Sequence, residues 1–228
     1  MLKHVFRSPT VKQFGLPRTG TNYCRFLLER NYQVEVLVDK EGWKHGYLSP
    51  MLHPCRMCVM LSKDPFAWFT SALRLYRHYM LSTYSVTVSS LGGFLRSKFI
   101  IGDRGCLLSF KNPIDCWNVM TRHWLSIPYT GRNFIAVRYE DLVKTPEETL
   151  GFIAKRFRLV RKIGDFENTA QTLGMSSDNQ NVSQRSQAFD PAYYLERKYM
   201  SLYTPEQIAY VNERLEKALL KKLKYQLE

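Results

Sequence analysis

Val11–Tyr23, with the sequence VKQFGLPRTGTNY, is the stretch that decides the fold. Val11–Leu16 has the composition of a short buried strand and reaches a glycine near its end. The next segment, Thr21–Arg30 (TNYCRFLLER), has the pattern of a helix with one apolar side. A strand, a Gly- and Pro-containing loop and a helix start, in this order, predict an anion-binding cradle. The reason is that the loop N–H groups and the helix N-terminus converge on one spot, where the helix dipole favours negative charge.

The loop has the glycine spacing of a Walker loop but lacks two of its functional residues. Gly15 and Gly20 stand five apart, as in G-x-x-x-x-G-K-[ST]. Thr21 occupies the place of the Walker lysine, and Asn22 occupies the place of the Ser/Thr that holds Mg²⁺. Arg18 is the only cation in the loop, and its planar guanidinium can donate paired hydrogen bonds to phosphate oxygens. These residues favour a donor that is bound without a bridging metal ion.

The segment LPRTGTNY resembles the 5′-phosphosulfate-binding loop of sulfotransferases that use 3′-phosphoadenosine 5′-phosphosulfate (PAPS), where members usually carry P-[KR]-[ST]-G-T. The resemblance implies that Arg18 and its neighbours bind the donor and stabilise the leaving group, 3′-phosphoadenosine 5′-phosphate (PAP). The implied donor-binding residues of this loop are Pro17, Arg18, Thr19, Gly20, Thr21, Asn22 and Tyr23. The competing interpretation is an ordinary corner between a strand and a helix.

A second segment has the composition of a phosphate site. Met57–Ser62 (MCVMLS) is apolar on both faces, as a central parallel strand should be, and runs into Lys63-Asp64-Pro65 and a helical segment. Pro65 suits a first helical turn, and Asp64 suits a helix cap. The family's 3′-phosphate site reads R-[DN]-P with a serine eight residues after the arginine. The resemblance therefore assigns Lys63 and Ser71 to the 3′-phosphate, although lysine lacks the bidentate geometry of arginine.

The loop after the second predicted strand, Tyr32–Val38, holds the candidate for proton transfer. His45 lies in this loop between two glycines, one strand away from the predicted cradle. Imidazole titrates near neutral pH, so His45 is our candidate general base. Lys44 is expected to place a second cation near the sulfonate. The alternative is a loop histidine with no chemical role.

The remaining sequence predicts a single α/β domain over residues 1–228, with a C-terminal helical extension over about 190–228. We expect three layers, with a mostly parallel, P-loop-like sheet of about 4–5 strands between helices. The predicted turns, helices and last strand are a helix near Leu91–Phe99, a turn at Gly102–Gly105, a helix from Asn112, a strand at Phe134–Val137, a helix after the family-like YEDL segment, and helices at Pro191–Tyr203 and Pro205–Tyr225.

Two further features leave alternatives open. Cys55 and Cys58 form a CxxC pair that is expected to be structural, with a zinc or redox site as the alternative. Thr172–Asp190 is polar and reads as a binding loop, a lid or a disordered segment, in which Arg185 is our choice for a further 3′-phosphate ligand.

The net charge of +13 favours anionic partners but does not choose among them. The resemblance implies a metal-free sulfotransferase acting on a hydroxyl or amine of a glycan, a peptidyl tyrosine or a small molecule. A P-loop kinase or NTPase, and a basic nucleic-acid-binding module, are the alternatives, although the sequence carries no nucleic-acid-binding motif. A donor-binding protein without turnover is a further one. With no signal peptide or membrane-spanning run in the sequence, we expect a cytoplasmic protein.

Overall fold

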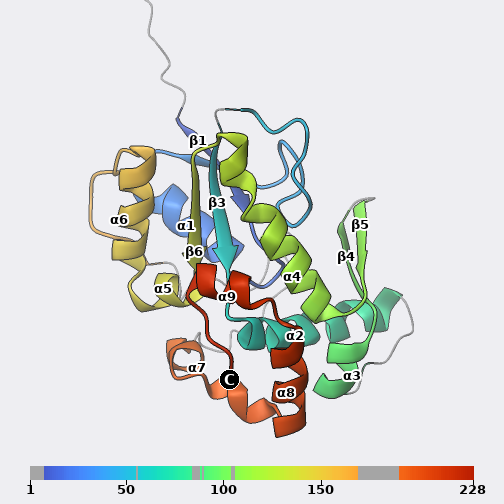
Figure 1. Cartoon of the computed structure of the whole chain (residues 1–228). Coiled ribbons are helices and arrows are strands. Elements are labelled where there is room, and N and C mark those ends of the chain that lie inside the picture. Colours follow the sequence, from blue (N-terminus) through green and yellow to red (C-terminus); the bar gives the residue numbers. More distant parts are fainter. Residues whose placement is uncertain (1–7, 55, 84–87, 89, 104–105, 169–189) are drawn as a thin grey trace, which may run out of the picture.

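The computed structural model of the 228-residue chain describes residues 8–54, 56–83, 88, 90–103, 106–168 and 190–228. A four-stranded, all-parallel sheet lies at its centre, with the strand order β2-β1-β3-β6 (Figure 1). Its strands are β1 (Thr10–Phe14), β2 (Glu35–Leu37), β3 (Met57–Ser62) and β6 (Phe134–Arg138). The predicted α/β architecture with a parallel sheet of about 4–5 strands is confirmed.

Helices cover both faces of the sheet because side chains alternate along each strand. In β1, Val11 joins the cluster formed with α1 (Thr21–Asn31) and α6 (Pro146–Phe157), whereas Phe14 joins the cluster on the opposite face. That second cluster includes residues of α2 (Pro65–Thr83), α4 (Pro113–Trp124), α8 (Pro205–Arg214) and α9 (Lys217–Leu223). The C-terminal helices therefore share a core with the sheet.

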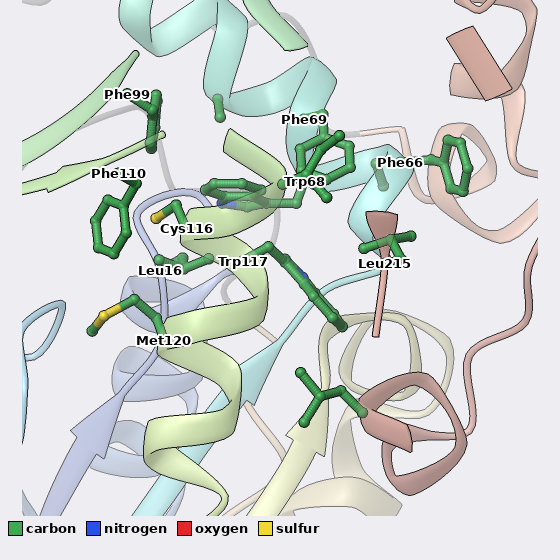
Figure 2. Packing of buried hydrophobic residues seen from close by; sticks show 14 of the residues in the cluster. Leu16, Phe66, Trp68, Phe69, Phe99, Phe110, Cys116, Trp117, Met120 and Leu215 are labelled. Atoms are coloured by element: carbon green, nitrogen blue, oxygen red, sulfur yellow. The ribbon is translucent and has the colours of Figure 1, made fainter. Parts of the chain in front are cut away.

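Large aromatic side chains fill the cluster that contains α2 and α4. Trp68 from α2 and Trp117 from α4 lie deep in it, together with Leu16 from the loop after β1 (Figure 2). Phe99 packs edge-to-face against Trp68, with 5.9 Å between ring centroids. The loop after β1 therefore packs against rigid, closely packed aromatic rings.

Phe99 belongs to an antiparallel strand pair that the sequence analysis missed. After α3 (Leu91–Arg96), β4 (Phe99–Asp103) pairs with β5 (Cys106–Phe110). The predicted turn at Gly102–Gly105 begins too early, because Gly102 and Asp103 lie within β4 and pair with Leu107 and Cys106 of β5; residues 104 and 105 lie outside the described residues. The predicted helix at Leu91–Phe99 is also too long, because the chain becomes extended from Ser97.

Both predicted C-terminal helices are interrupted. The first divides into α7 (Pro191–Leu195) and the 3-10 helix η3 (Lys198–Leu202), because Arg197 adopts a left-handed conformation, with φ of 56°. The second ends at Arg214 and restarts at Lys217. The amide of Asn118 bridges this break: it donates to the Arg214 carbonyl at 2.8 Å and accepts from Glu216 N–H at 3.2 Å. The described residues also include the helical segments α5 (Tyr139–Lys144) and η1 (Ile127–Thr130).

The strand order indicates where on the sheet a ligand would bind. β1 lies between β2 on one side and β3 on the other, so the chain connections diverge at the β1–β3 pair. Ligands of open α/β sheets bind at such a switch point, outside the carboxyl ends of the strands. In the part of the chain that is described, no helix combines the length and apolar character needed to cross a bilayer.

Candidate functional site

The loop after β1 is shaped by close backbone approaches. Gly15 N–H donates to the Lys44 carbonyl at 3.2 Å, and a Cβ at Gly15 would stand 2.7 Å from the Leu61 carbonyl oxygen. Thr19 closes the turn, because both its N–H and its hydroxyl donate to the Leu16 carbonyl, at 3.2 and 2.7 Å. Arg18 adopts φ of 73° between them, and its side chain is exposed. The loop therefore holds its cation at the surface on a constrained backbone.

The N-terminus of α1 forms the cradle itself. Gly20 is its N-cap and adopts φ of 86°, a conformation that favours glycine. A side chain at this position would also collide with the Tyr139 ring, since a Cβ would stand 2.7 Å from Cε2. Within the described residues, no side chain caps α1, and its first turn contains no acidic residue. The first N–H groups of α1 and the positive end of its dipole can therefore interact with an anion.

The loop after β2 packs against this cradle. The buried Lys44 ammonium donates to Asn22 Oδ1 at 2.7 Å, and His45 Nδ1 hydrogen-bonds the Gly15 carbonyl. A carbonyl only accepts, so Nδ1 carries the proton of a neutral imidazole and Nε2 keeps its lone pair. Burial, with the nearby Lys44 ammonium second, lowers the pKa of His45 to about 3. The ring is therefore neutral at physiological pH.

Lys63, directly after β3, completes the site from the neighbouring strand. Its side chain is almost fully buried, and Nζ lies 3.2 Å from the Arg18 carbonyl oxygen and 3.5 Å from Ser71 Oγ. The ammonium also lies over two tyrosine rings that pack edge-to-face against each other, 4.2 Å from the Tyr139 centroid and 4.1 Å from that of Tyr194. The ends of β1 and β3 thus meet at one point.

Opposing influences act on the pKa of Lys63. Burial lowers its pKa to about 7, and the positive charges of Arg18 and Arg74 act in the same direction. The carboxylates of Glu140 and Asp64 oppose this shift. In the free protein the ammonium therefore titrates within the physiological range, which is unusual for lysine.

The carboxylates of Asp64 and Glu140, whose charges act on Lys63, accept hydrogen bonds that stabilise the fold. Asp64 caps α2 as predicted, because its Oδ1 accepts from the N–H groups of Phe66 and Ala67 at 2.9 and 3.2 Å. Glu140 Oε1 accepts from Asp64 N–H at 2.9 Å, and its Oε2 accepts from the buried Tyr225 hydroxyl at 2.9 Å. Burial, reinforced by Glu140, raises the pKa of Asp64 to about 6. Glu140 thus links the turn after β3 to the end of the C-terminal helices.

Most of the sequence-predicted residues lie together. The strand ends and the loop after β2 gather Pro17, Arg18, Thr19, Gly20, Thr21, Asn22, Lys44, His45, Lys63 and Ser71. Tyr23 is the exception, because it packs in the cluster on the α1 face and its hydroxyl donates to Asn168 at 2.9 Å. Arg185 and Cys55 lie outside the described residues. Cys58 is buried within β3, where desolvation raises the pKa of its thiol to about 12.

The sequence analysis missed several residues of the site. Tyr139 and Tyr194 lie against Lys63 but far from it in the sequence; Tyr139 belongs to the YEDL segment, to which the sequence analysis gave no role at the site. Lys12 is fully buried within β1, and the detectable signal was a cation inside an otherwise strand-like apolar run. Trp68 was visible only as part of a helix, although its indole N–H donates to the Pro17 carbonyl at 2.7 Å.

Two surface hollows lie away from these residues. One, of about 660 Å³, lies between the C-terminal end of α1 and residues 162–167. The other, of about 560 Å³, lies beside the end of β6 and is lined also by α5, α6 and α9. Neither is lined by a predicted site residue.

Comparisons with known proteins give one structural similarity. No protein-family model matches the chain, and no curated protein matches it. Among solved structures, the chain is similar to the sulfotransferase domain from the Synechococcus PCC 7002 olefin synthase, with 19% identity and a TM-score of 0.43. The similarity covers 79% of this chain and 53% of that structure, so the chain spans about half of the length of the protein that it matches.

Proposed function

We propose that the chain is a sulfotransferase that moves a sulfuryl group from PAPS to a hydroxyl or amine acceptor without a metal ion. The observation that carries the proposal is the meeting of two phosphate-type strand ends: Lys63 Nζ lies 3.2 Å from the Arg18 carbonyl. When bound, PAPS would supply the sulfuryl group and leave as PAP. Two anion-binding elements at adjacent strand ends suit an adenosine that carries phosphates on both its 3′ and 5′ positions.

The donor set fits such a ligand. Arg18 and the N–H groups at the start of α1 would hold the 5′ side and stabilise negative charge on the departing phosphate. Lys63 and Ser71 would hold the 3′-phosphate. Within the described residues, two of the three N–H donors of Lys63 have hydrogen-bond partners, which leaves the third for a phosphate oxygen.

His45 is proposed as the proton acceptor. Its neutral ring donates through Nδ1 to Gly15, so Nε2 can accept the proton of an acceptor hydroxyl. A pKa of about 3 in the free protein makes it a weak base, because proton transfer is most efficient when the pKa lies near the working pH. An anionic donor beside Lys44 would raise this pKa, since it offsets the positive charge that contributes to the lowering.

The residues of the loop disfavour the kinase alternative. Thr21 stands in the place of the lysine that contacts the β- and γ-phosphates, and Asn22 in the place of the hydroxyl that holds Mg²⁺. The amide of Asn22 instead accepts a hydrogen bond from Lys44. The nucleic-acid alternative has only the net charge of +13 in its favour.

Calorimetry with nucleotides tests the proposal. We expect PAP to bind the purified chain without added metal, and to bind more tightly than ADP in the presence or absence of Mg²⁺. Transfer of ³⁵S from labelled PAPS to a mixed panel of glycans, tyrosine peptides and small alcohols would then identify the acceptor class. If PAP does not bind, or if Mg²⁺–ATP binds and is hydrolysed, the proposal is wrong.

A matched pair of variants makes the binding test specific to the site. Arg18→Ala removes the exposed cation of the loop, whereas Arg25→Ala removes a cation from α1 that pairs with Glu29 at 3.0 Å. Arg25→Ala should leave PAP binding unchanged. A similar loss in both variants would mean that the net charge, and not the site, binds the ligand.

A further inference from the structure

Lys12 is a buried cation in the middle of the sheet. It lies in β1, its side chain is fully buried, and it is on the face of the sheet that Phe14 also occupies. An isolated ammonium in this environment would be strongly destabilising, so it must have hydrogen-bond partners.

Three main-chain carbonyls of one loop provide these partners. Lys12 Nζ donates to the Val38 carbonyl at 2.8 Å, to the Lys40 carbonyl at 2.9 Å and to the Gly42 carbonyl at 2.5 Å. An ammonium has three donors, so all of them are used. The acceptors alternate along the segment that begins directly after β2, and this one side chain therefore fixes its path.

The same segment is also held from outside. Glu41 and Gly42 adopt left-handed conformations, with φ of 62° and 105°, and Glu41 pairs with Arg56, whose Nε donates to Oε2 at 2.9 Å. Asp39 and Glu41 also place negative charge near Lys12. The Lys12 ammonium, on the core side, and the Arg56–Glu41 ion pair therefore both fix the conformation of residues 38–42.

The held turn leads directly into the site. Two residues after Gly42, the Lys44 carbonyl accepts from Gly15 N–H at 3.2 Å, and Lys44 Nζ reaches Asn22 at 2.7 Å. His45 then hydrogen-bonds the Gly15 carbonyl. Any displacement of the turn would move both side chains relative to the cradle.

We propose that Lys12 is a positioning residue, whose buried ammonium fixes residues 38–42 and thereby holds Lys44 and His45 against the Gly15–Asn22 loop. Its importance for sulfuryl transfer rests on the function proposed above; its effect on the loop does not. A shift of about 1 Å in a reacting group can lower a rate about 10²-fold, so a side chain remote from the chemistry can control turnover.

Amide hydrogen exchange in the Lys12→Met variant tests the effect on the loop. Gly15 N–H and Gly46 N–H both donate to carbonyls of this loop, those of Lys44 and Trp43. In Lys12→Met we expect both amides to exchange at least about tenfold faster, while Leu159 N–H, which bonds to Ala154 elsewhere in the molecule, stays unchanged. Lys40→Met is the matched control, because its ammonium pairs at the surface with Glu35. Unchanged exchange at Gly15 and Gly46 in Lys12→Met would overturn the proposal.

Kinetics separates positioning from general stability. In Lys12→Met we expect turnover at saturating donor to fall about 10²-fold, with the dissociation constant of PAP nearly unchanged. Leu150→Ala, in the core on the opposite face, supplies a destabilised comparison. Equal turnover losses in the two variants at equal stability would overturn the catalytic role of Lys12. If the wild-type chain neither binds PAP nor transfers sulfate, the proposed function fails, while the exchange experiment still tests the loop.

A titration of the wild-type protein covers the case in which Lys12→Met does not fold. Burial lowers the pKa of Lys12 to about 8, and the charged or titratable groups that act on it are Asp39, Glu41, Lys44 and Cys58. Deprotonation removes one donor, so the protection of Gly15 and Gly46 N–H should fall as the pH rises through about 8, after correction for intrinsic exchange. Constant protection from about pH 7 to about pH 9.5 would contradict the proposal.

Discussion

The ends of β1 and β3 each carry one cation of the proposed donor site, under opposite conditions. Arg18 is exposed on a left-handed backbone, whereas Lys63 is 2% exposed and lies over the Tyr139 and Tyr194 rings. The guanidinium keeps its charge at every physiological pH. The buried ammonium has a pKa of about 7 and is charged in only part of the population at neutral pH. One strand end therefore has a permanent charge, and the charge of the other depends on pH and ligand.

Replacing Arg18 with alanine should have the largest effect, because it removes the permanent charge. We expect turnover to fall about 10²–10³-fold and PAP binding to weaken, since a donor aimed at developing charge is lost. Steady-state kinetics and calorimetry measure the two effects, with Arg25→Ala as the control. Normal turnover in Arg18→Ala would show that the exposed cation has no part in the reaction.

Replacing His45 with alanine should affect chemistry and not binding. Turnover should fall about 10²-fold, at the lower end of the range for a general base, because the pKa of about 3 makes the free imidazole weakly basic. The dissociation constant of PAP should remain almost the same. His53→Ala, at an exposed loop residue, is the comparison. Full turnover without His45 would remove it from the mechanism.

The pH dependence of PAP binding should distinguish the two cations. Below about pH 7 Lys63 is protonated and ready to bind a phosphate. Above that pH, binding must draw a proton from solvent, so affinity should fall by up to about tenfold per pH unit. Calorimetry from about pH 7 to about pH 9, where the phosphates are fully ionised, measures this slope.

Lys63→Arg is the variant that completes this titration. Its guanidinium stays charged, so the alkaline loss of affinity should disappear. A slope that is the same in both proteins would mean that the titrating group is not Lys63.

Replacing Tyr225 with phenylalanine should have the smallest effect and should act on the β3 end alone. The change removes the hydroxyl that donates to Glu140 at 2.9 Å and lies 3.1 Å from Ser62 Oγ. The free energy of unfolding should fall by roughly 1–3 kcal/mol, because the half-buried Glu140 carboxylate loses a donor. Urea unfolding measures this, and Tyr210→Phe, which retains the ring that packs on Arg96 and Arg214, should be nearly neutral. Equal stability of the two variants would mean that the Glu140 link adds nothing.

The elements set by local rules were predictable from the sequence. The sequence predicts a helix from Asn112 with Pro113 in its first turn, and α4 begins there, with Asn112 as a cap that accepts from Asp115 N–H at 2.9 Å. The convergence of Arg18 and Lys63 was also predictable, because the carboxyl ends of parallel strands share one edge.

Features that depend on distant partners were not predictable. The break after Arg214 depends on the Asn118 amide, which lies 96 residues away. Likewise, the two tyrosine rings that contact Lys63 come from α5 and α7. The pKa of His45 follows from its burial and from the Lys44 ammonium beside it, neither of which the residue type reveals.

Two of the three buried indole rings in the cluster that contains α2 and α4 can serve as optical reporters of the site. Trp68 N–H donates to the Pro17 carbonyl at 2.7 Å, and Trp117 N–H lies 3.4 Å from the Lys63 carbonyl. The loop after β1 and the turn after β3 therefore each contact a different tryptophan. Tryptophan emission can be recorded while an unlabelled nucleotide is titrated into Trp68→Phe and into Trp117→Phe. The comparison would reveal which of the two strand ends responds first.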